Sequence, residues 1–269
     1  MNVSQGPGNL VFMAVLFIIF AVSIYYLYKW LNGANNDMKD LAVYTTSTGL
    51  IAMSSTTTTV SDSMPQLYGG GEFSISTWIY ITNWGINKGA NKVFLTLSGG
   101  SGSFSTIVMY LGQNINKLGV RVSYDTSNAI GTANTLDTTQ MGLIKNSVTP
   151  YTDVASDFKK CDIESVDLQR WVNVTAVLSG RTLDVYMDGK LSRSCVLDGI
   201  YKVDGDKTTL VLGGPNGFGG FIGQTRAANF AYSPDQVYRK YLNGPFDGSI
   251  WTWIKRYFNP SITVDVKLN

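Results

Sequence analysis

Residues Trp171–Leu191 read WVNVTAVLSGRTLDVYMDGKL, and this stretch decides the fold. Apolar residues occupy every second position in two runs, which is the period of half-buried strands: Val172, Val174, Ala176 and Leu178, and then Leu183, Val185 and Met187. Ser179-Gly180 can turn the chain between them, and Asp188-Gly189 is a two-residue hairpin turn of the kind that needs positive φ. The stretch therefore predicts three consecutive antiparallel strands.

Similar short runs, separated by glycine-containing turns, continue on both sides of this stretch. Many short strands with regular turn signals predict an all-β sandwich or jelly roll. One sandwich can occupy about 200–250 residues, so we expect a single β-domain. The predicted strands are Phe73–Ile81, Lys92–Leu97, Ser105–Leu111, Gly119–Tyr124, Trp171–Leu178, Thr182–Met187, Leu191–Val196, Thr208–Leu212 and Gly220–Ala231.

Two further segments belong to this domain. Ser233-Pro234-Asp235 supplies an N-cap residue, a first-turn proline and an acidic first turn, so it predicts a helix that ends at Asn243-Gly244-Pro245. Leu41–Ser63 is rich in threonine and serine. It is either a flexible stalk or partly a strand that crosses the sandwich, and the β-propensity of threonine favours the strand.

The order of these features resembles the laminin-G-like domains of the concanavalin A-like lectin/glucanase superfamily. Trp171–Leu191 is similar to the core hairpins of that family. Three further pieces follow the family's order: Glu72–Ile81 (EFSISTWIYI), Thr208–Gly214 (TTLVLGG) and Phe218–Gly244. The resemblance spans about Glu72–Gly244 and implies a two-sheet jelly roll, and we expect the whole β-domain to cover residues 41–248. It leaves the function open, because this fold carries lectins, glucanases, adhesion modules and structural proteins.

Residue content argues against an enzyme. The chain has no histidine, which excludes histidine bases, histidine-assisted nucleophiles and histidine-ligated metals. Retaining glucanases of the resembled superfamily need two carboxyl groups about 5 Å apart. The only glutamates are Glu72 and Glu164, far apart in the chain and outside any such motif. We expect no enzymatic activity and no cofactor.

Charge and loop residues bear on two other classes of ligand. With 21 basic and 19 acidic residues the net charge is +2, which is too balanced for a surface that tracks phosphates, so we expect no nucleic-acid partner. Members of the resembled family often bind calcium through loop aspartates. Isolated loop aspartates are usually turn formers, so we predict no metal and keep calcium as an alternative. The candidate loops hold Asp198, Asp204 and Asp206, and Asp153, Asp157 and Asp162.

The N-terminal residues predict a membrane anchor. Leu10–Tyr28 contains no charged residue, and as a helix it would be about 28 Å long, close to the hydrocarbon thickness of a bilayer. Aromatic residues beside a lysine are typical of the membrane interface. We expect a transmembrane helix at about residues 10–30 within segment 1–31, then a polar linker, 32–40. The predicted interface residues are Tyr25, Tyr26, Tyr28, Lys29 and Trp30.

The side of the membrane and the state of the cysteines are linked. Lys29 and Lys39 follow the predicted span and no basic residue precedes it, so the positive-inside rule places the β-domain on the cytoplasmic side. Cys161 and Cys195 are the only pair that can form a disulfide in this chain. Cytoplasmic thiols normally stay reduced, so an oxidised pair would conflict with this placement unless the assembly has its own oxidation chemistry.

An aromatic extension, 249–269, follows the region of resemblance. Its first part reads SIWTWIKRYFNP. It is either a last strand packed on the sandwich or a partner-binding surface, because Trp, Tyr and Arg dominate interface energetics. The candidate partner-binding residues are Trp251, Trp253, Lys255, Arg256 and Tyr257.

Together these features predict a non-enzymatic, membrane-anchored structural or binding module that tethers a protein assembly to a membrane. The architecture resembles a membrane-linked minor capsid protein of a large DNA virus, with the lipid bilayer and capsid proteins as partners in the virion. The alternative is a glycan-binding, lectin-like adhesin on a cell or virion surface. The sequon at Asn173 would need a lumenal domain, and we expect it to be a chance match.

Overall fold

A computed structural model of the chain has two compact units, residues 1–39 and 40–269. The first contains one helix, α1 (Pro7–Gly33), and the second contains the β-domain. The structure describes residues 7–33, 41–44, 50–52, 58–60, 64–99, 104–125, 141–142, 144–145, 161–203, 205, 208–213 and 217–246.

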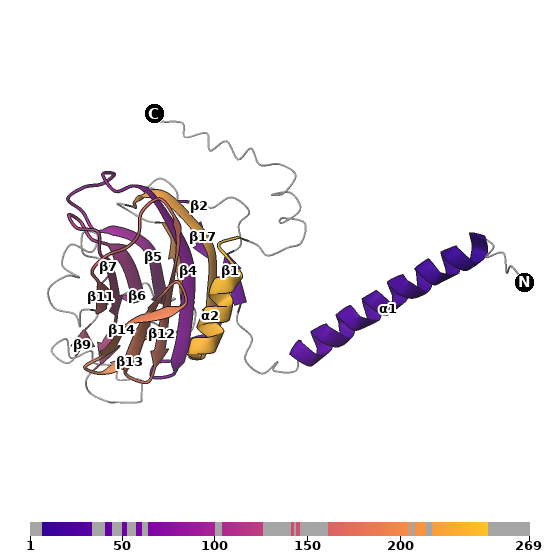
Figure 1. Cartoon of the computed structure of the whole chain (residues 1–269). Coiled ribbons are helices and arrows are strands. Elements are labelled where there is room, and N and C mark those ends of the chain that lie inside the picture. Colours follow the sequence, from indigo (N-terminus) through magenta and orange to yellow (C-terminus); the bar gives the residue numbers. More distant parts are fainter. Residues whose placement is uncertain are drawn as a thin grey trace, which may run out of the picture. The chain divides into compact units, whose positions relative to one another are not determined.

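Two large sheets face each other in the β-domain (Figure 1). Sheet A has the order β1-β17-β4-β12-β13-β14, with β2 also paired to β17. Sheet B has the order β11-β7-β6-β5-β16-β3, with β10 also paired to β6, and a small sheet has the order β15-β8-β9. The strands of sheet A are β1 (Leu41–Tyr44), β2 (Leu50–Ile51), β4 (Glu72–Asn83), β12 (Trp171–Ser179), β13 (Thr182–Met187), β14 (Lys190–Val196) and β17 (Gly219–Ala228). The strands of sheet B are β3 (Thr58–Val60), β5 (Lys92–Gly99), β6 (Phe104–Leu111), β7 (Leu118–Val122), β10 (Ile144–Lys145), β11 (Cys161–Ile163) and β16 (Thr208–Leu212). The small sheet contains β8 (Tyr124–Asp125), β9 (Met141–Gly142) and β15 (Ile200–Tyr201).

The predicted three-strand unit is confirmed as β12, β13 and β14. Successive strands pair antiparallel, with Ala176 opposite Val185 and Val185 opposite Arg193. Asp188 and Gly189 have φ values of 50° and 77°, as a two-residue hairpin turn of this kind requires. The pairing of β13 with β14 shifts register after Val185, so the edge strand carries an irregularity that the sequence did not predict.

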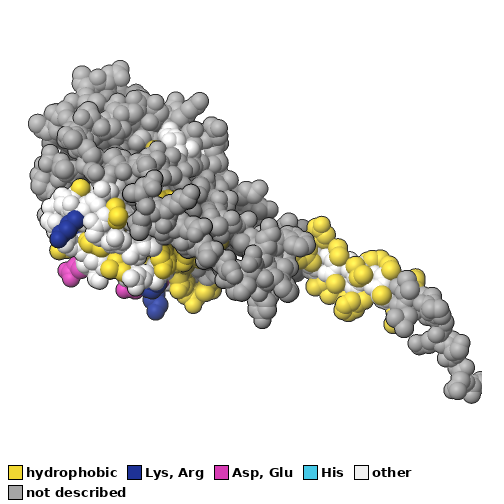
Figure 2. Space-filling model, turned by 90° about the horizontal axis from the view of Figure 1, so that it is seen from above, with side chains coloured by type: hydrophobic (Ala, Val, Ile, Leu, Met, Phe, Trp, Pro, Cys, Tyr) yellow, Lys and Arg dark blue, Asp and Glu magenta, His cyan; other side chains and the backbone are white. Residues whose placement is uncertain are grey.

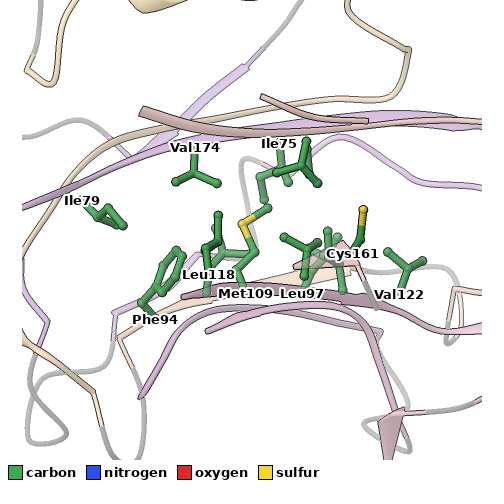
Figure 3. Close-up of a cluster of buried hydrophobic side chains, with 14 of the residues drawn as sticks. Ile75, Ile79, Phe94, Leu97, Met109, Leu118, Val122, Cys161 and Val174 are labelled. Carbon is green, nitrogen blue, oxygen red and sulfur yellow. The ribbon is translucent and has the colours of Figure 1, made fainter. Parts of the chain in front are cut away.

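The core lies between the two sheets. Ile75, Ile79 and Val174 of sheet A point toward Phe94 and Met109 of sheet B (Figure 3). Each of these side chains is almost fully buried. The alternation that predicted the strands therefore also predicted their inward faces, and burial of this apolar surface is the main stabilising contribution.

The threonine-rich segment after residue 40 crosses between the sheets. β1 and β2 both pair with β17 in sheet A, whereas β3 pairs with β16 in sheet B. The strand alternative is therefore correct for these three pieces. The rest of this segment lies outside the described residues.

Helix α2 (Pro234–Leu242) packs on the outer face of sheet A (Figure 1). Ser233 is its N-cap, and the Ser233 and Gln236 side chains form a reciprocal capping box. Val237 is buried against Val177 and Tyr186. Tyr241, one turn later, stacks on Trp78 of β4, whereas Tyr238 and Leu242 are exposed.

A disulfide joins Cys161 of β11 to Cys195 of β14. These are edge strands of sheet B and sheet A respectively, so the bond links the two sheets along one side of the sandwich. An oxidised pair conflicts with a domain in the reducing cytoplasm.

The predicted membrane-spanning segment, about residues 10–30, is helical as part of α1. All side chains of residues 12–27 are exposed, and Figure 2 shows the described part of this helix covered with apolar side chains. Among the described residues, no helix combines the length and the apolarity needed to cross a membrane. The helix is confirmed, and the membrane crossing stays a prediction.

Candidate binding surface

A row of aromatic side chains crosses the outer face of sheet A. Phe221 of β17 pairs with Tyr80 of β4, and Tyr80 pairs with Trp171 of β12. The ring centroids lie 6.4 Å apart for Tyr80 and Phe221 and 5.5 Å apart for Tyr80 and Trp171. All three side chains are half-buried. We call Phe221, Tyr80 and Trp171 the aromatic row.

The row is extended at both ends. Ile51 of β2 pairs with Phe221 and is 49% exposed. At the other end, the ring of Phe246 stands edge-on to Trp171 with 5.2 Å between centroids. Because paired residues on neighbouring strands point to the same face, these side chains form one continuous apolar strip.

The segment that carries Phe246 is held on the sheet by its backbone. The carbonyl of Pro245 accepts a 2.7 Å hydrogen bond from the Gln224 amide of β17. A Cβ atom at Gly223 would lie 2.7 Å from the Pro245 carbonyl oxygen and 3.0 Å from the Trp171 ring. Gly223 therefore permits this close approach.

Charged residues form a rim next to Trp171. The Arg170 guanidinium donates to Asp167 at 2.7 Å and to Asp188 at 2.6 Å, and it also contacts the Trp171 carbonyl. Burial lowers the pKa of Arg170, but its hydrogen bonds and attraction to the two carboxylates outweigh burial and raise it. Asp188 also accepts from the Asn173 amide at 2.9 Å, which links the rim to β12.

Buried polar groups lie beside the row on the same face. The Asn173 side chain donates to the Ser76 hydroxyl at 3.1 Å, and Thr175 donates to the same hydroxyl at 2.8 Å. Asn173 is only 1% exposed, so the sequon Asn173-Val174-Thr175 is unavailable in the folded domain. Trp78 is stacked against Tyr241 of α2, with 5.5 Å between centroids, and closes this side of the surface.

The outer face of sheet B is different, because it buries charge. Arg121 of β7 lies between the core residues Val120 and Val122 but points to the opposite face, where its side chain is 0% exposed. Its guanidinium donates to both carboxylate oxygens of Asp162 of β11, and Lys117 contacts the same carboxylate at 3.0 Å. Burial raises the pKa of Asp162, but the hydrogen bonds and charges of Arg121 and Lys117 outweigh burial and hold this pKa below its usual value.

An aromatic ring lies under this ion pair. The Arg121 guanidinium is 5.3 Å from the centroid of Tyr110. Burial raises the pKa of the Tyr110 hydroxyl to about 12, with a smaller opposing effect of Arg121. The group is therefore a neutral wall of the ion-pair site at physiological pH.

Several predicted site residues are not in these surfaces. Among the calcium candidates, Asp162 is engaged with two cations, and Asp198 is exposed. Asp153, Asp157, Asp204 and Asp206 lie outside the described residues. Across the described part of the chain, no group of three acidic or cysteine residues is placed to hold a metal ion.

The two glutamates have separate surroundings. The Glu72 carboxylate accepts from the Ser179 hydroxyl at 2.9 Å and from the Ala231 amide at 3.3 Å, so it ties β4 to its neighbours. Glu164 is exposed just after β11. Each has a structural setting of its own rather than a shared cleft.

The remaining predicted site residues lie in the two ends of the chain. Tyr25 and Tyr26 are exposed on α1, with 5.6 Å between ring centroids. Tyr28, Lys29 and Trp30 are in the same helix, but their side chains lie outside the described residues. The candidate partner-binding residues Trp251, Trp253, Lys255, Arg256 and Tyr257 also lie outside the described residues.

The aromatic row itself was missed by sequence reasoning. Tyr80 and Trp171 could be placed on an outward face, since they alternate with the inward Ile81 and Val172. Their meeting with Phe221 depends on the pairing register of three strands that are distant in the chain. The sequence carries no local signal for that register.

Comparison with known proteins agrees with the fold. A laminin-G family model, described as concanavalin A-like lectin/glucanases superfamily, matches residues 53–238. The chain belongs to this superfamily. No curated protein matches the chain.

Solved structures with a similar fold include a point mutant of HCR/D, with a TM-score of 0.50 and 14% identity over 77% of this chain and 45% of that chain. The receptor binding domain of botulinum neurotoxin D is similar, with a TM-score of 0.48 and 14% identity over 77% of this chain and 46% of that chain. The chain thus spans less than half the length of these structures, and the likeness concerns the fold alone.

Proposed function

We propose that this chain is a non-enzymatic binding module, anchored in a membrane, that tethers a protein assembly through the outer face of sheet A. The partly buried aromatic row, on the outer face of sheet A, carries this proposal. Trp and Tyr side chains held rigidly on a sheet lose little entropy on binding, and they are the residues that most often dominate interface energetics. The charged rim next to Trp171 would add polar specificity around the apolar contact.

Helix α1 supports the anchoring part of the proposal. Its exposed side chains between Phe12 and Leu27 are apolar on every side of the helix, and Leu10–Tyr28 contains no charge. A helix that is apolar all round needs apolar surroundings. Tyr25 and Tyr26 near its C-terminal end would lie at the headgroup level.

The disulfide is relevant to the question of which side of the membrane the β-domain lies on. The bond between Cys161 and Cys195 is typical of an oxidising compartment, whereas the cytoplasmic placement depends on Lys29 and Lys39 alone. We therefore propose that the β-domain lies on the non-cytoplasmic side. The alternative is a β-domain on the cytoplasmic side that links an internal virion membrane to capsid proteins. In that case the virus would need its own system to oxidise the two thiols.

A second candidate function is glycan binding on a cell or virion surface. The aromatic row is also suited to stacking against the apolar face of a sugar ring, and the disulfide fits display outside the cytoplasm. The absence of a paired-glutamate cleft among the described residues favours binding over hydrolysis in either case.

Membrane cross-linking of the full chain tests the tether. In native membranes, Tyr80→Ser with Trp171→Ser should abolish a saturable protein cross-link that the wild type makes. The matched control is Leu191→Ser with Val196→Ser, since both residues are exposed on β14 of the same sheet. Equal cross-linking by all three proteins would contradict the proposal.

A glycan array and a thiol assay separate the remaining alternatives. Glycan binding that is lost in Tyr80→Ser with Trp171→Ser would establish the second candidate instead of the tether. Maleimide labelling without reductant should leave Cys161 and Cys195 unmodified in the unfolded chain. Labelling of both would remove the argument for the non-cytoplasmic side.

A further inference from the structure

Strand β14 (Lys190–Val196) forms one edge of sheet A. It is the last strand in the order of that sheet, and no described strand pairs with its outer side. Every residue of β14 except Cys195 is exposed. The unpaired backbone groups of an exposed edge are a template to which a further strand can bind.

The hydrogen-bonding pattern shows which backbone groups point outward. The Leu197 amide donates to the Arg181 carbonyl at 2.7 Å, so in this antiparallel ladder every second residue faces β13. The amide and carbonyl groups of Ser194 and Val196 therefore point away from β13. In the part of the chain that the structure describes, no hydrogen bond is formed to these four groups.

Two cations project from one side of this strand. Lys190 is opposite Met187, and Arg193 is opposite Val185. Val185 is in the core between the sheets and Met187 packs against it, so both cations project on the side that faces sheet B. The Arg193 guanidinium accordingly donates to the Asp162 carbonyl of β11 at 2.9 Å.

A third cation lies at the end of the strand. The exposed Arg181 guanidinium donates to the Leu197 carbonyl at 3.1 and 2.9 Å. None of the three cations forms an ion pair with a described carboxylate. Asp184 of β13 is opposite Ser194, but it alternates with core residues and so lies on the other face of the sheet.

We propose that the β14 edge binds an extended segment of a partner protein that carries acidic side chains at alternate positions. The segment would add to sheet A as a further strand and exchange hydrogen bonds with Ser194 and Val196. Its acidic side chains would lie on one face, beside Lys190 and Arg193, because a strand places every second residue on the same face. This site is separate from the aromatic row.

The charges select an acidic partner over a second copy of this chain. Strand β14 reads KLSRSCV, so two such strands side by side would bring only cations together. Like charges on paired strands are destabilising, and cations on an edge are a common protection against self-pairing. An acidic segment gains opposite-charge pairs at the same positions and is attracted before contact.

Binding of a synthetic peptide to the full chain in detergent micelles tests the charge selection. The probe is fluorescein-labelled Thr-Glu-Val-Glu-Val-Glu-Thr, and its anisotropy should show saturable binding that weakens as salt is raised. Arg193→Glu should lower the affinity at least about ten-fold. The matched charge reversal Lys88→Glu, at an exposed position before β5 of the other sheet, should change the affinity by less than about two-fold.

Two further measurements test strand addition itself. Ser194→Pro removes an amide that points away from β13, so it keeps the pairing with β13 and should abolish binding of the peptide. Near-UV circular dichroism checks that this variant is folded. N-methylation of the backbone amides of the peptide keeps its charges and should abolish its binding to the wild type, which remains decisive if the proline variant misfolds.

Four results would overturn the proposal. The first is no binding of the probe at concentrations up to about 1 mM. The second is binding that survives N-methylation, which would show attraction by charge alone. The third is equal binding of the peptide with lysine in place of glutamate. The fourth is self-association of the full chain that Ser194→Pro removes, which would identify a second copy as the occupant. None of these measurements uses the aromatic row, so the proposed function is tested separately.

Discussion

The outer faces of the two sheets depart in different ways from the usual pattern, in which apolar side chains are buried and charged side chains are exposed. Sheet A leaves Phe221, Tyr80 and Trp171 only partly buried, whereas sheet B buries the guanidinium of Arg121 completely. Exposed aromatic surface and buried charge are both unfavourable unless something compensates for them. On sheet B the compensation is internal, because the Asp162 carboxylate pairs with the Arg121 guanidinium.

On sheet A the compensation is not supplied by the described residues, apart from Phe246 at one end. The outer face of sheet B therefore stabilises the domain, whereas the outer face of sheet A could bury further apolar surface by binding a partner. Perturbing sheet B should therefore change folding, and perturbing the aromatic row should change binding with little effect on folding.

The largest expected effect on stability comes from removing the disulfide that connects the edges of the two sheets. Cys161→Ser with Cys195→Ser should lower the free energy of unfolding by about 4 kcal/mol, because the bond closes a loop with a sequence separation of 34 residues. Urea unfolding of the full chain in micelles, followed by tryptophan fluorescence, measures this. Reduction of the wild type should reproduce the loss, and an unchanged midpoint in both would refute the role of the bond.

The next effect concerns the buried charge of sheet B. Arg121→Met should cost about 3 kcal/mol, because it leaves the Asp162 carboxylate without its main partner. Adding Asp162→Leu should recover part of that loss, since the carboxylate that has lost its main partner is then removed as well. The same unfolding experiment measures both variants. A double variant less stable than Arg121→Met would contradict this account.

A pH dependence should follow from the same site. The lowered pKa of Asp162 means that its ion pair stabilises the domain above about pH 4 and loses this contribution as pH falls through the folded-state pKa. Asp162→Asn should therefore be less stable than the wild type by about 2 kcal/mol at pH 7. Unfolding curves measured between pH 7 and pH 3 should show that the difference in free energy of unfolding between the two proteins decreases as the pH falls. A difference that does not change with pH would exclude titration of Asp162 as its cause.

The smallest expected effect on folding is at the aromatic row. Ile51→Ser, at the end of the row, should change the free energy of unfolding by about 1 kcal/mol, because its side chain is 49% exposed on the short strand β2. A loss as large as that of Arg121→Met would assign the row to the folding core and remove the contrast between the two faces.

The long strands could be predicted because their signal is local. β13 and β16 have the predicted bounds, and β12 differs by one residue at its end. Strand β11 was missed because it has only three residues. It is held in place by residues that are distant in the chain: Cys161 forms the disulfide with Cys195 on one face of the strand, and Asp162 pairs with Arg121 on the other. Alternation carries no information about either contact.

The candidate site was less predictable than the fold for a related reason. Alternation indicates which side chains point outward, but only strand order brings β17, β4 and β12 together. Sequence reasoning instead selected Trp251 and Trp253, where aromatic residues are dense in the chain.

Strand β17 has a mechanical consequence. It pairs with β1, the first strand after α1, and it also holds the Pro245 carbonyl and one end of the aromatic row. The shortest hydrogen-bonded path from β1 to Trp171 therefore runs β1–β17–β4–β12, entirely within sheet A. A pull applied between β1 and the aromatic row would act first on these three strand pairs, across the strands rather than along the core.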